Sequence, residues 1–278
     1  MIGLRQQFAL PILLKVSGLA RSTFYYHEKV LQAGDKSAEL KTQITSIYAR
    51  HQGRYGYRRI TAAMRQMGHM INHKAVQRLM KILGLKSLVR VKKYRSYRGT
   101  LGRIAPDILK RDFLAQAPNQ KWVTDVTEFK VGNEKLYLSP VMDLYNGEII
   151  AFETAKRPAF TLISGMLEKA FSKLQQKDAP ILHSDQGWQY QLSQYQHLLK
   201  TRNLTQSMSR KGNCLDNAAM ESFFGTLKSE YFHLNTFNSI DQLRAGVAKY
   251  IEYYNHDRIK LKLKGLSPVQ YRNQPLSA

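Results

Sequence analysis

Cysteine is almost absent from this chain, which has one, Cys214, among 278 residues. A disulfide within the chain and a multi-cysteine zinc site are therefore excluded, and the composition fits a reducing compartment. Long apolar runs are absent as well, because FALPILL and GEIIAF are far shorter than the roughly 20 residues that cross a bilayer. No apolar stretch near the N-terminus is followed by a small-residue cleavage site, so we expect no signal peptide. These absences predict a cytoplasmic protein with no membrane partner.

Acidic residues are missing from one long stretch. Between Glu39 and Asp107 there are none, whereas the same stretch has sixteen Lys or Arg. The chain has a formal charge of +23, yet from Asp107 onward 22 basic residues are nearly balanced by 17 acidic ones. The positive charge is therefore concentrated in one part of the chain, and its helical patterning indicates contact with DNA or RNA. A ribosome-associated surface and an anionic membrane surface are the alternatives.

Residues 1–34 predict a helix–turn–helix. Apolar residues from Phe8 to Leu13 form one helical face, Ser17-Gly18 interrupts it, and a second helix restarts from Leu19 to His27. A recognition helix presents its N-terminal side chains to DNA. The candidate contacts are Arg21, Ser22 and Thr23. A plain helical hairpin is the alternative.

Residues 35–85 predict a second helical unit with a DNA-binding surface. After a helix that ends near Arg50, Ile60, Met64 and Met67 follow helical spacing up to Gly68. The last helix, from His73 to Leu83, has its apolar residues on one face. The outer residues all have the same sign, which favours DNA. The candidate contacts in this unit are Arg58, Arg59, Lys74 and Arg78. Residues 86–117 predict a basic linker in which Lys92, Lys93 and Arg95 alternate with tyrosines and could follow a phosphate backbone.

From residue 118 to 238 the periodicity changes to that of strands. Strands are predicted over 123–131, 135–144 and 148–155, followed by a helix over 160–174 and a strand over 181–185. A helix over 193–200, a strand over 204–209 and a long helix from Asp216 complete the pattern. This order predicts an α/β ribonuclease-H-like fold, with three antiparallel strands and then parallel strands joined by crossover helices. Residues 239–278 are expected to form a C-terminal helix and tail packed on this core.

Three acids occupy elements that could bring them together. Asp125 lies in the first predicted strand, Asp185 at the end of the fourth, and Glu221 on the last helix of the core. The two strands are neighbours in this topology, so the three carboxylates could hold Mg²⁺ or Mn²⁺, with two ions per site. Each acid alone could equally be a surface or turn residue. Glu128 and Asp143 are left out, because Glu128 is out of phase with Asp125 and Asp143 precedes a turn.

Five motifs carry a resemblance to a known family. They are HQGRYGYRRI (51–60), Trp-x-x-Asp at Trp122 to Asp125, HSDQGWQY (183–190), SRKGNCLDNAAMESFFGTLKSE (209–230) and YYNHDRIKLKLKGLSPVQY (253–271). Together they resemble the second-frame (OrfB) transposase of the IS-three family of bacterial insertion sequences, which has an integrase-type catalytic core. The resemblance covers nearly the whole chain. It implies an aspartate–aspartate–glutamate polynucleotidyl transferase in which Asp125, Asp185 and Glu221 bind the metal.

The resemblance also implies a reaction and partners. Water would nick DNA at the element's end, and the released 3′-hydroxyl would attack another phosphodiester. The N-terminal units would bind the terminal inverted repeats, and paired ends would require at least a homodimer. A small upstream-frame protein (OrfA) would be a partner by fusion or association, and the protein would be associated with the bacterial nucleoid. A ribonuclease-H-like nuclease without joining activity and a non-catalytic DNA-binding regulator are the alternatives.

Further residues of these motifs have assigned roles. The resemblance matches Lys228 to a basic residue that contacts the terminal phosphate, and two helical turns place it on the face of Glu221, with Gly225 leaving room between them. Arg210 and Lys211 form a basic loop that could grip DNA. His183 is interpreted as a packing group rather than a metal ligand. Asp216 and Asn217 are predicted to cap the helix of Glu221. Tyr254, Asn255 and Arg258 are predicted to lock the C-terminal helix onto the core.

Overall fold

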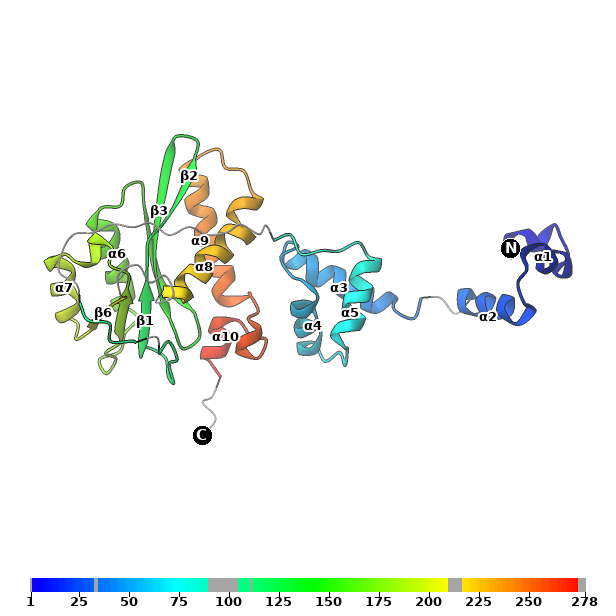
Figure 1. Ribbon diagram of the computed structural model, residues 1–278, viewed down its shortest axis with the longest axis horizontal. Helices are drawn as coiled ribbons and strands as arrows, with labels where there is room; N and C mark the ends of the chain where they lie inside the picture. Colours follow the sequence, from blue (N-terminus) through cyan, green and yellow to red (C-terminus); the bar gives the residue numbers. More distant parts are fainter. Residues whose placement is uncertain (1, 33–34, 90–104, 111, 210–216, 275–278) are drawn as a thin grey trace.

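The computed structural model describes residues 2–32, 35–89, 105–110, 112–209 and 217–274. Figure 1 shows a mixed sheet between two layers of helices, together with two helical units from the N-terminal third of the chain. No helix within the described ranges is long and apolar enough to span a bilayer. Several predicted DNA contacts or motif residues lie outside these ranges, namely Lys92, Lys93, Arg95, Arg210, Lys211, Cys214 and Asp216.

The first helical unit contains two helices joined by a turn, as the pattern predicts. A short 3₁₀ helix, η1 (Ile2–Gln6), precedes α1 (Leu10–Ser17) and α2 (Arg21–Gln32). Gly18 adopts a φ of 66° and ends α1, a conformation that glycine takes at little cost. The expected apolar face is mostly exposed, since Leu13 is buried on α1 whereas Phe8 and Ile12 are about half exposed. The DNA-reading role of this unit remains a prediction.

The second helical unit has its own core. It consists of α3 (Ala38–Arg50), α4 (Tyr57–Gln66) and α5 (His73–Ile82). Ile44, Ile60 and Val76, one from each helix, are fully buried in a common cluster. Asn72 starts α5, because its side-chain oxygen accepts a hydrogen bond from the Lys74 amide at 2.8 Å. Met67 was expected on the buried face of α4 but is exposed, because it follows the last helical residue.

The sheet has six strands in the described part of the chain. Its order is β2-β3-β1-β5-β6, and β4 pairs with β3. The strands are β1 (Lys121–Thr124), β2 (Thr127–Val131), β3 (Glu134–Asp143), β4 (Ile149–Ala155), β5 (Ile181–Ser184) and β6 (Thr205–Met208). β3 is antiparallel to β1, β2 and β4, whereas β5 is parallel to both β1 and β6. This is the ribonuclease-H-like arrangement that the element order predicts.

The prediction of one continuous first strand was wrong. The segment 123–131 is divided into β1 and β2, and Asp125 and Val126 lie between them. At this break the Asp125 carboxylate accepts a hydrogen bond from the Val126 amide at 2.7 Å, a local bond outside the strand ladders. The long β3 pairs with both pieces. Asp125 therefore lies at the end of a strand rather than inside one.

Alternation along β1 directs neighbouring side chains into two cores. Trp122 packs with α6 (Phe160–Phe171) and α7 (Ser193–Lys200) on one face of the sheet. Val123 packs on the other face with α8 (Ala218–Glu230) and α9 (Ile240–His256), and Figure 1 shows both layers. Both side chains are completely buried. Because α9 forms part of one core, the predicted boundary at residue 238 divides a single packed layer.

The end of the expected basic linker packs on the core. The Pro106 carbonyl accepts a hydrogen bond from the Met208 amide at 3.3 Å, and the Ile108 amide donates to the Ser207 hydroxyl at 2.9 Å. Both contacts lie along β6. Residues 106 and 108, which were predicted to belong to the linker, therefore pack against the sheet.

The C-terminal motif locks the last helices onto the sheet, as predicted. Asn255 on α9 accepts from the Ile149 amide and donates to the Ile149 carbonyl, both at 2.9 Å, as a neighbouring strand would. Tyr254, also on α9, is buried in the core that α9 shares with α8 and the sheet. After a short 3₁₀ helix, η5 (Leu261–Leu263), the helix α10 (Pro268–Arg272) begins with a capping box formed by Ser267 and Gln270.

Candidate functional site

Two carboxylates lie side by side where the parallel strands β1 and β5 end. Val123 is paired with His183, so the same register continued by two residues places Asp125 opposite Asp185. Neighbouring strands are about 4.8 Å apart, which brings two such side chains close together. Asp125 accepts from the Val126 amide at 2.7 Å, and Asp185 accepts from the Gly187 amide at 2.8 Å. Across the described residues, no protein donor reaches the second oxygen of either carboxylate.

Gly187 fits tightly against Asp185. A Cβ atom at this position would lie 2.9 Å from an Asp185 carboxylate oxygen and 2.9 Å from the side chain of Gln189. The glycine therefore lets the backbone approach the carboxylate closely and donate to it. This contact fixes one oxygen of Asp185.

The third acid is linked to the same strand end through the beginning of α8. Asn217 precedes α8, and its side-chain amide donates to the Thr124 carbonyl, the last residue of β1, at 3.2 Å. Asn217 occupies the N-cap position of α8, as predicted, but its side chain makes no capping hydrogen bond. The bond to Thr124 instead joins the first turn of α8, which contains Glu221, to the position next to Asp125.

The site disfavours three negative charges. Burial, and then the nearness of Asp185 and Glu221, raise the pKa of Asp125 well above its usual value. Burial also raises the pKa of Asp185 and of Glu221. Because these shifts oppose ionisation of the three carboxyl groups, a bound cation would stabilise their charged forms.

The three acids are chemically suited to bind a divalent cation, but their side chains do not meet at one point in this structure. Carboxylate oxygens are preferred ligands of Mg²⁺ and Mn²⁺, and Asp125 and Asp185 each present one oxygen to which no donor among the described residues is bonded. In the part of the chain that the structure describes, no three His, Cys, Asp or Glu side chains lie close enough to hold one ion. Glu221, which is half-buried, would have to move toward the pair to complete the site.

Lys228 lies two turns after Glu221 on α8 and is held from the sheet. Its ammonium donates to the Thr127 hydroxyl at 2.7 Å and lies 5.3 Å from the centre of the Phe129 ring. Burial lowers the pKa of Lys228, while the charges of Glu128 and Asp125 oppose this shift. Between the acid and the lysine, a Cβ on Gly225 would meet nothing within 4 Å. Among the described residues, no neighbour comes close enough to this part of the helix face to require the glycine.

Thr127 was not singled out by sequence analysis, and its contact with Lys228 leads to a prediction. Thr127→Val removes the hydroxyl while keeping the side-chain shape, so Lys228 loses its fixed partner. If the chain has the DNA-joining activity that its family resemblance implies, we expect joining to fall by about tenfold, the effect of one hydrogen bond to a charged group. Rates of joining on a pre-nicked end measure this, and Thr127→Ser should restore most of the activity. Equal rates for the valine and wild-type proteins would contradict the positioning role.

His183 is buried on β5, two residues before Asp185. Its ring is completely buried, Nδ1 is 2.9 Å from the Ser207 hydroxyl, and the edge of the ring contacts Phe113. This placement agrees with the interpretation of His183 as a packing group. Close by, Trp188 follows Asp185 in the 3₁₀ helix η2 (Trp188–Tyr190) and is 47% exposed. An aromatic residue within a polar motif was the only sequence signal for this exposed ring.

The predicted DNA contacts outside the core differ in exposure. Arg58, Lys74 and Arg78 are exposed on α4 and α5. Arg21 and Ser22 are exposed at the start of α2, and Thr23 is half-buried. Arg59 is different, because its guanidinium donates to the buried carboxylate of Glu230 on α8 at 3.1 Å. We therefore remove Arg59 from the proposed DNA-binding surface.

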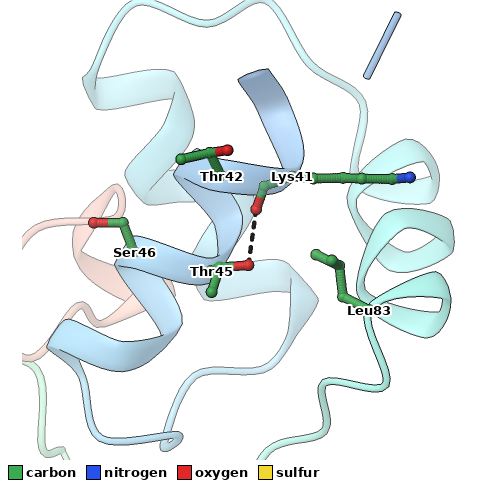
Figure 2. A pocket seen from close by; sticks show the side chains of 5 residues that line it. All are labelled: Lys41, Thr42, Thr45, Ser46 and Leu83. Carbon is green, nitrogen blue, oxygen red and sulfur yellow. Dashed lines mark hydrogen bonds between the residues drawn. The ribbon is translucent and has the colours of Figure 1, made fainter. Parts of the chain in front are cut away.

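A hollow in the helical unit lies apart from the acids. It has a volume of about 430 Å³ and is lined by α3 residues and by Leu83, which follows α5 (Figure 2). The Thr45 hydroxyl donates to the Lys41 carbonyl of the same helix at 2.9 Å, so this side chain is already satisfied. The lining includes no acid, and the hollow is not part of the candidate site.

Comparisons with known proteins match both the helical unit and the core of the chain. Models described as integrase core domain match residues 115–214 and 221–276, and a model described as HTH-like domain matches residues 35–93. The chain is 56% identical to the putative transposase InsK for insertion sequence element IS150 of Escherichia coli K12, over 98% of this chain and 96% of that protein. It is 33% identical to the transposase InsF for insertion sequence IS3A of the same organism, over 98% and 96%.

One solved structure shares the fold. A chain in the cryo-electron microscopy structure of the simian T-cell lymphotropic virus intasome, in complex with the PP2A regulatory subunit B56 gamma, superposes with a TM-score of 0.52. The match covers 84% of this chain and 76% of that chain at 16% identity. At this identity the likeness concerns the fold alone.

Proposed function

The chain belongs to the IS-three family of insertion-sequence transposases and is a DNA transposase with an integrase-type core, and from this premise we propose the roles of its residues. Asp125, Asp185 and Glu221 are the catalytic acids of a polynucleotidyl transferase. The observation that carries this assignment is the parallel register of β1 and β5, which sets the two aspartates side by side beside the first turn of α8.

The acids would hold divalent cations, Mg²⁺ or Mn²⁺, with two per site. When bound, such ions activate the attacking oxygen and stabilise the leaving oxygen of a phosphodiester. The Gly187 amide and the Val126 amide each fix one carboxylate oxygen, so Asp125 and Asp185 are already oriented. Lys228 would contact a phosphate at the element's end, and the open face at Gly225 would let the DNA backbone approach between Glu221 and Lys228.

One site then serves two steps. In the first step, water attacks the phosphodiester at the element's end, and a 3′-hydroxyl is released. In the second step, this hydroxyl attacks a target phosphodiester, and the 3′-oxygen of the attacked strand leaves. Each step forms one P–O bond and breaks one, so no external energy source is needed. The site's residues are the same in both steps, because only the attacking oxygen changes.

The helical units would bind the terminal inverted repeats. Arg58, Lys74 and Arg78 are exposed on the unit that matches the HTH-like model, and they would contact phosphates or base edges. Two ends must be held together for joining, which favours a dimer or larger assembly on the bacterial nucleoid. An upstream-frame partner protein, fused or associated, would add to end recognition.

The test is joining by the purified wild-type chain. A labelled duplex that carries the element's end, with and without Mg²⁺, should give nicked product and then joined product only with the metal. If the protein nicks DNA but forms no joined product, even from a substrate that already carries the nick, it would instead be a ribonuclease-H-like nuclease. Metal-independent binding without any cleavage would indicate a DNA-binding regulator.

A further inference from the structure

Helix α8 connects the catalytic site to the second helical unit. Glu221 lies in its first turn and Glu230 is its last residue, about 13 Å farther along the helix axis. Two residues so placed on one continuous helix cannot change their separation without breaking it. The residues that bind Glu230 are therefore held at a fixed distance along α8 from Glu221.

Glu230 is gripped from two sides. Arg258, from the segment after α9, donates to its two oxygens at 2.8 and 2.7 Å, and the Tyr250 hydroxyl donates at 2.9 Å. From the helical unit, Arg59 donates to the carboxylate at 3.1 Å and Arg54 donates to the backbone carbonyl at 3.2 Å. The Glu230 side chain is only 4% exposed. We call these five residues the Glu230 junction.

A second set of contacts surrounds the junction. The Tyr55 hydroxyl donates to the Asp257 carbonyl at 3.0 Å and accepts from the Ile259 amide at 2.8 Å. Ile259 is itself buried in the core of the helical unit. His51 stacks on Tyr55 with ring centres 3.8 Å apart, and burial lowers the pKa of His51 to about 4, which keeps the ring neutral. The unit is thus docked on the catalytic core by directional bonds and apolar packing.

Two adjacent arginines on α4 face in different directions. Arg59 faces the core and binds Glu230, whereas Arg58 is exposed and its guanidinium lies over the Tyr57 ring. Lys74 and Arg78, on α5, are also exposed. The helical unit therefore uses one surface to dock on the core and leaves another to meet DNA.

We propose that the Glu230 junction sets the distance between the DNA sequence bound by α4 and α5 and the phosphodiester that is cut. Arg59 and Tyr55 act as positioning residues through this docking and touch no reacting atom. The proposal rests on the proposed function, because it assumes nicking at the acids. Without the junction, the unit still binds its sequence, but the active site meets several neighbouring phosphates instead of one.

The experiment maps the nick to the nucleotide. Arg59→Ala and Tyr55→Phe weaken the docking from two independent contacts, and Arg58→Ala is the matched control on the same helix. The probe is an end-labelled duplex containing the element's end, with Mg²⁺ present, and the affinity for it is measured without metal. Hydrogen exchange of the α8 and α9 amides, without DNA, reports whether the docking has loosened.

For the first two variants we expect nicks over at least two or three adjacent phosphates, affinity within about twofold of wild type, and faster exchange near Glu230. For Arg58→Ala we expect weaker binding and a nick at the wild-type phosphate. A single wild-type nick in both docking variants despite faster exchange would overturn the proposal. So would a loss of affinity in Arg59→Ala with the nick in place, which would make Arg59 a DNA contact. If the wild-type protein cuts no end, the proposed function fails. Independently of cleavage, unchanged hydrogen exchange in both docking variants would overturn the role of the Glu230 junction.

Discussion

Asp125→Asn, Asp185→Asn and Glu221→Gln should each lower the rates of nicking and joining by about three orders of magnitude, while binding of the element's end stays near normal. Each change removes one negative charge and keeps the side-chain shape, so the electrostatic stabilisation of the reacting phosphate is lost without a cavity. The measurement is single-turnover cleavage and joining at saturating Mg²⁺, with gel-shift affinity for the uncleaved end. Normal joining by any one of the three purified variants would refute its assignment.

Glu128→Gln is the matched control for these substitutions. Glu128 lies three residues after Asp125, is exposed, and pairs with Lys135 across the hairpin at 3.1 Å. Loss of an acid there should change activity by less than about twofold, because a surface ion pair contributes little. If Glu128→Gln were as inactive as Asp125→Asn, the effect would come from the net charge of the strand rather than from the site.

Asp125→Asn should raise the stability of the metal-free protein, although it lowers activity. Burial and neighbouring acids raise the pKa of Asp125 in the folded state above its unfolded value, so ionisation at neutral pH opposes folding. Asp125→Asn removes that charge, and the variant should therefore melt at a higher temperature than wild type in EDTA. With Mg²⁺ the order should narrow or reverse, because only the wild-type site gains from the ion.

The placement of the two aspartates near neighbouring strand ends could be predicted from the sequence. The division of residues 123–131 into two strands could not. Residues 123–131 are rich in β-branched side chains, which predicts a single strand. In the structure the break coincides with the hydrogen bond from the Val126 amide to the Asp125 carboxylate, a local contact that strand propensity does not predict. The parallel pairing of the strands that precede Asp125 and Asp185 was predictable, since it follows from the order of elements.

The docking of the helical unit could not be predicted from sequence. Arg58 and Arg59 are adjacent arginines in an acid-free stretch, so both are interpreted as DNA contacts. Their difference depends on Glu230, which lies 171 residues after Arg59. Nothing in helical periodicity reports a partner so distant. A buried glutamate at the end of a core helix becomes informative only when its neighbours are known.

Arg258→Ala is expected to destabilise the protein by about 3–5 kcal/mol, because it leaves the buried charge of Glu230 without its main partner. Arg258 and Glu230 are 7% and 4% exposed and share two hydrogen bonds. Urea unfolding at neutral pH, followed by circular dichroism, measures the change. Lys156→Ala, which breaks the exposed ion pair with Glu134, is the control and should cost less than about 1 kcal/mol.

The pH dependence separates a lost charge pair from lost packing. Burial alone would raise the pKa of Glu230, but the hydrogen bonds and charge of Arg258, with Arg59 and Tyr250, hold it below its usual value. A folded-state pKa below the unfolded one stabilises the protein at pH values above the unfolded pKa, and this contribution is lost as the pH falls through the folded pKa. The difference between wild type and Arg258→Ala should therefore be full at neutral pH and shrink in acid. Adding Glu230→Gln to Arg258→Ala should recover part of the loss at neutral pH, whereas a loss that is unchanged in acid and in the double variant would show that Arg258 acts through packing alone.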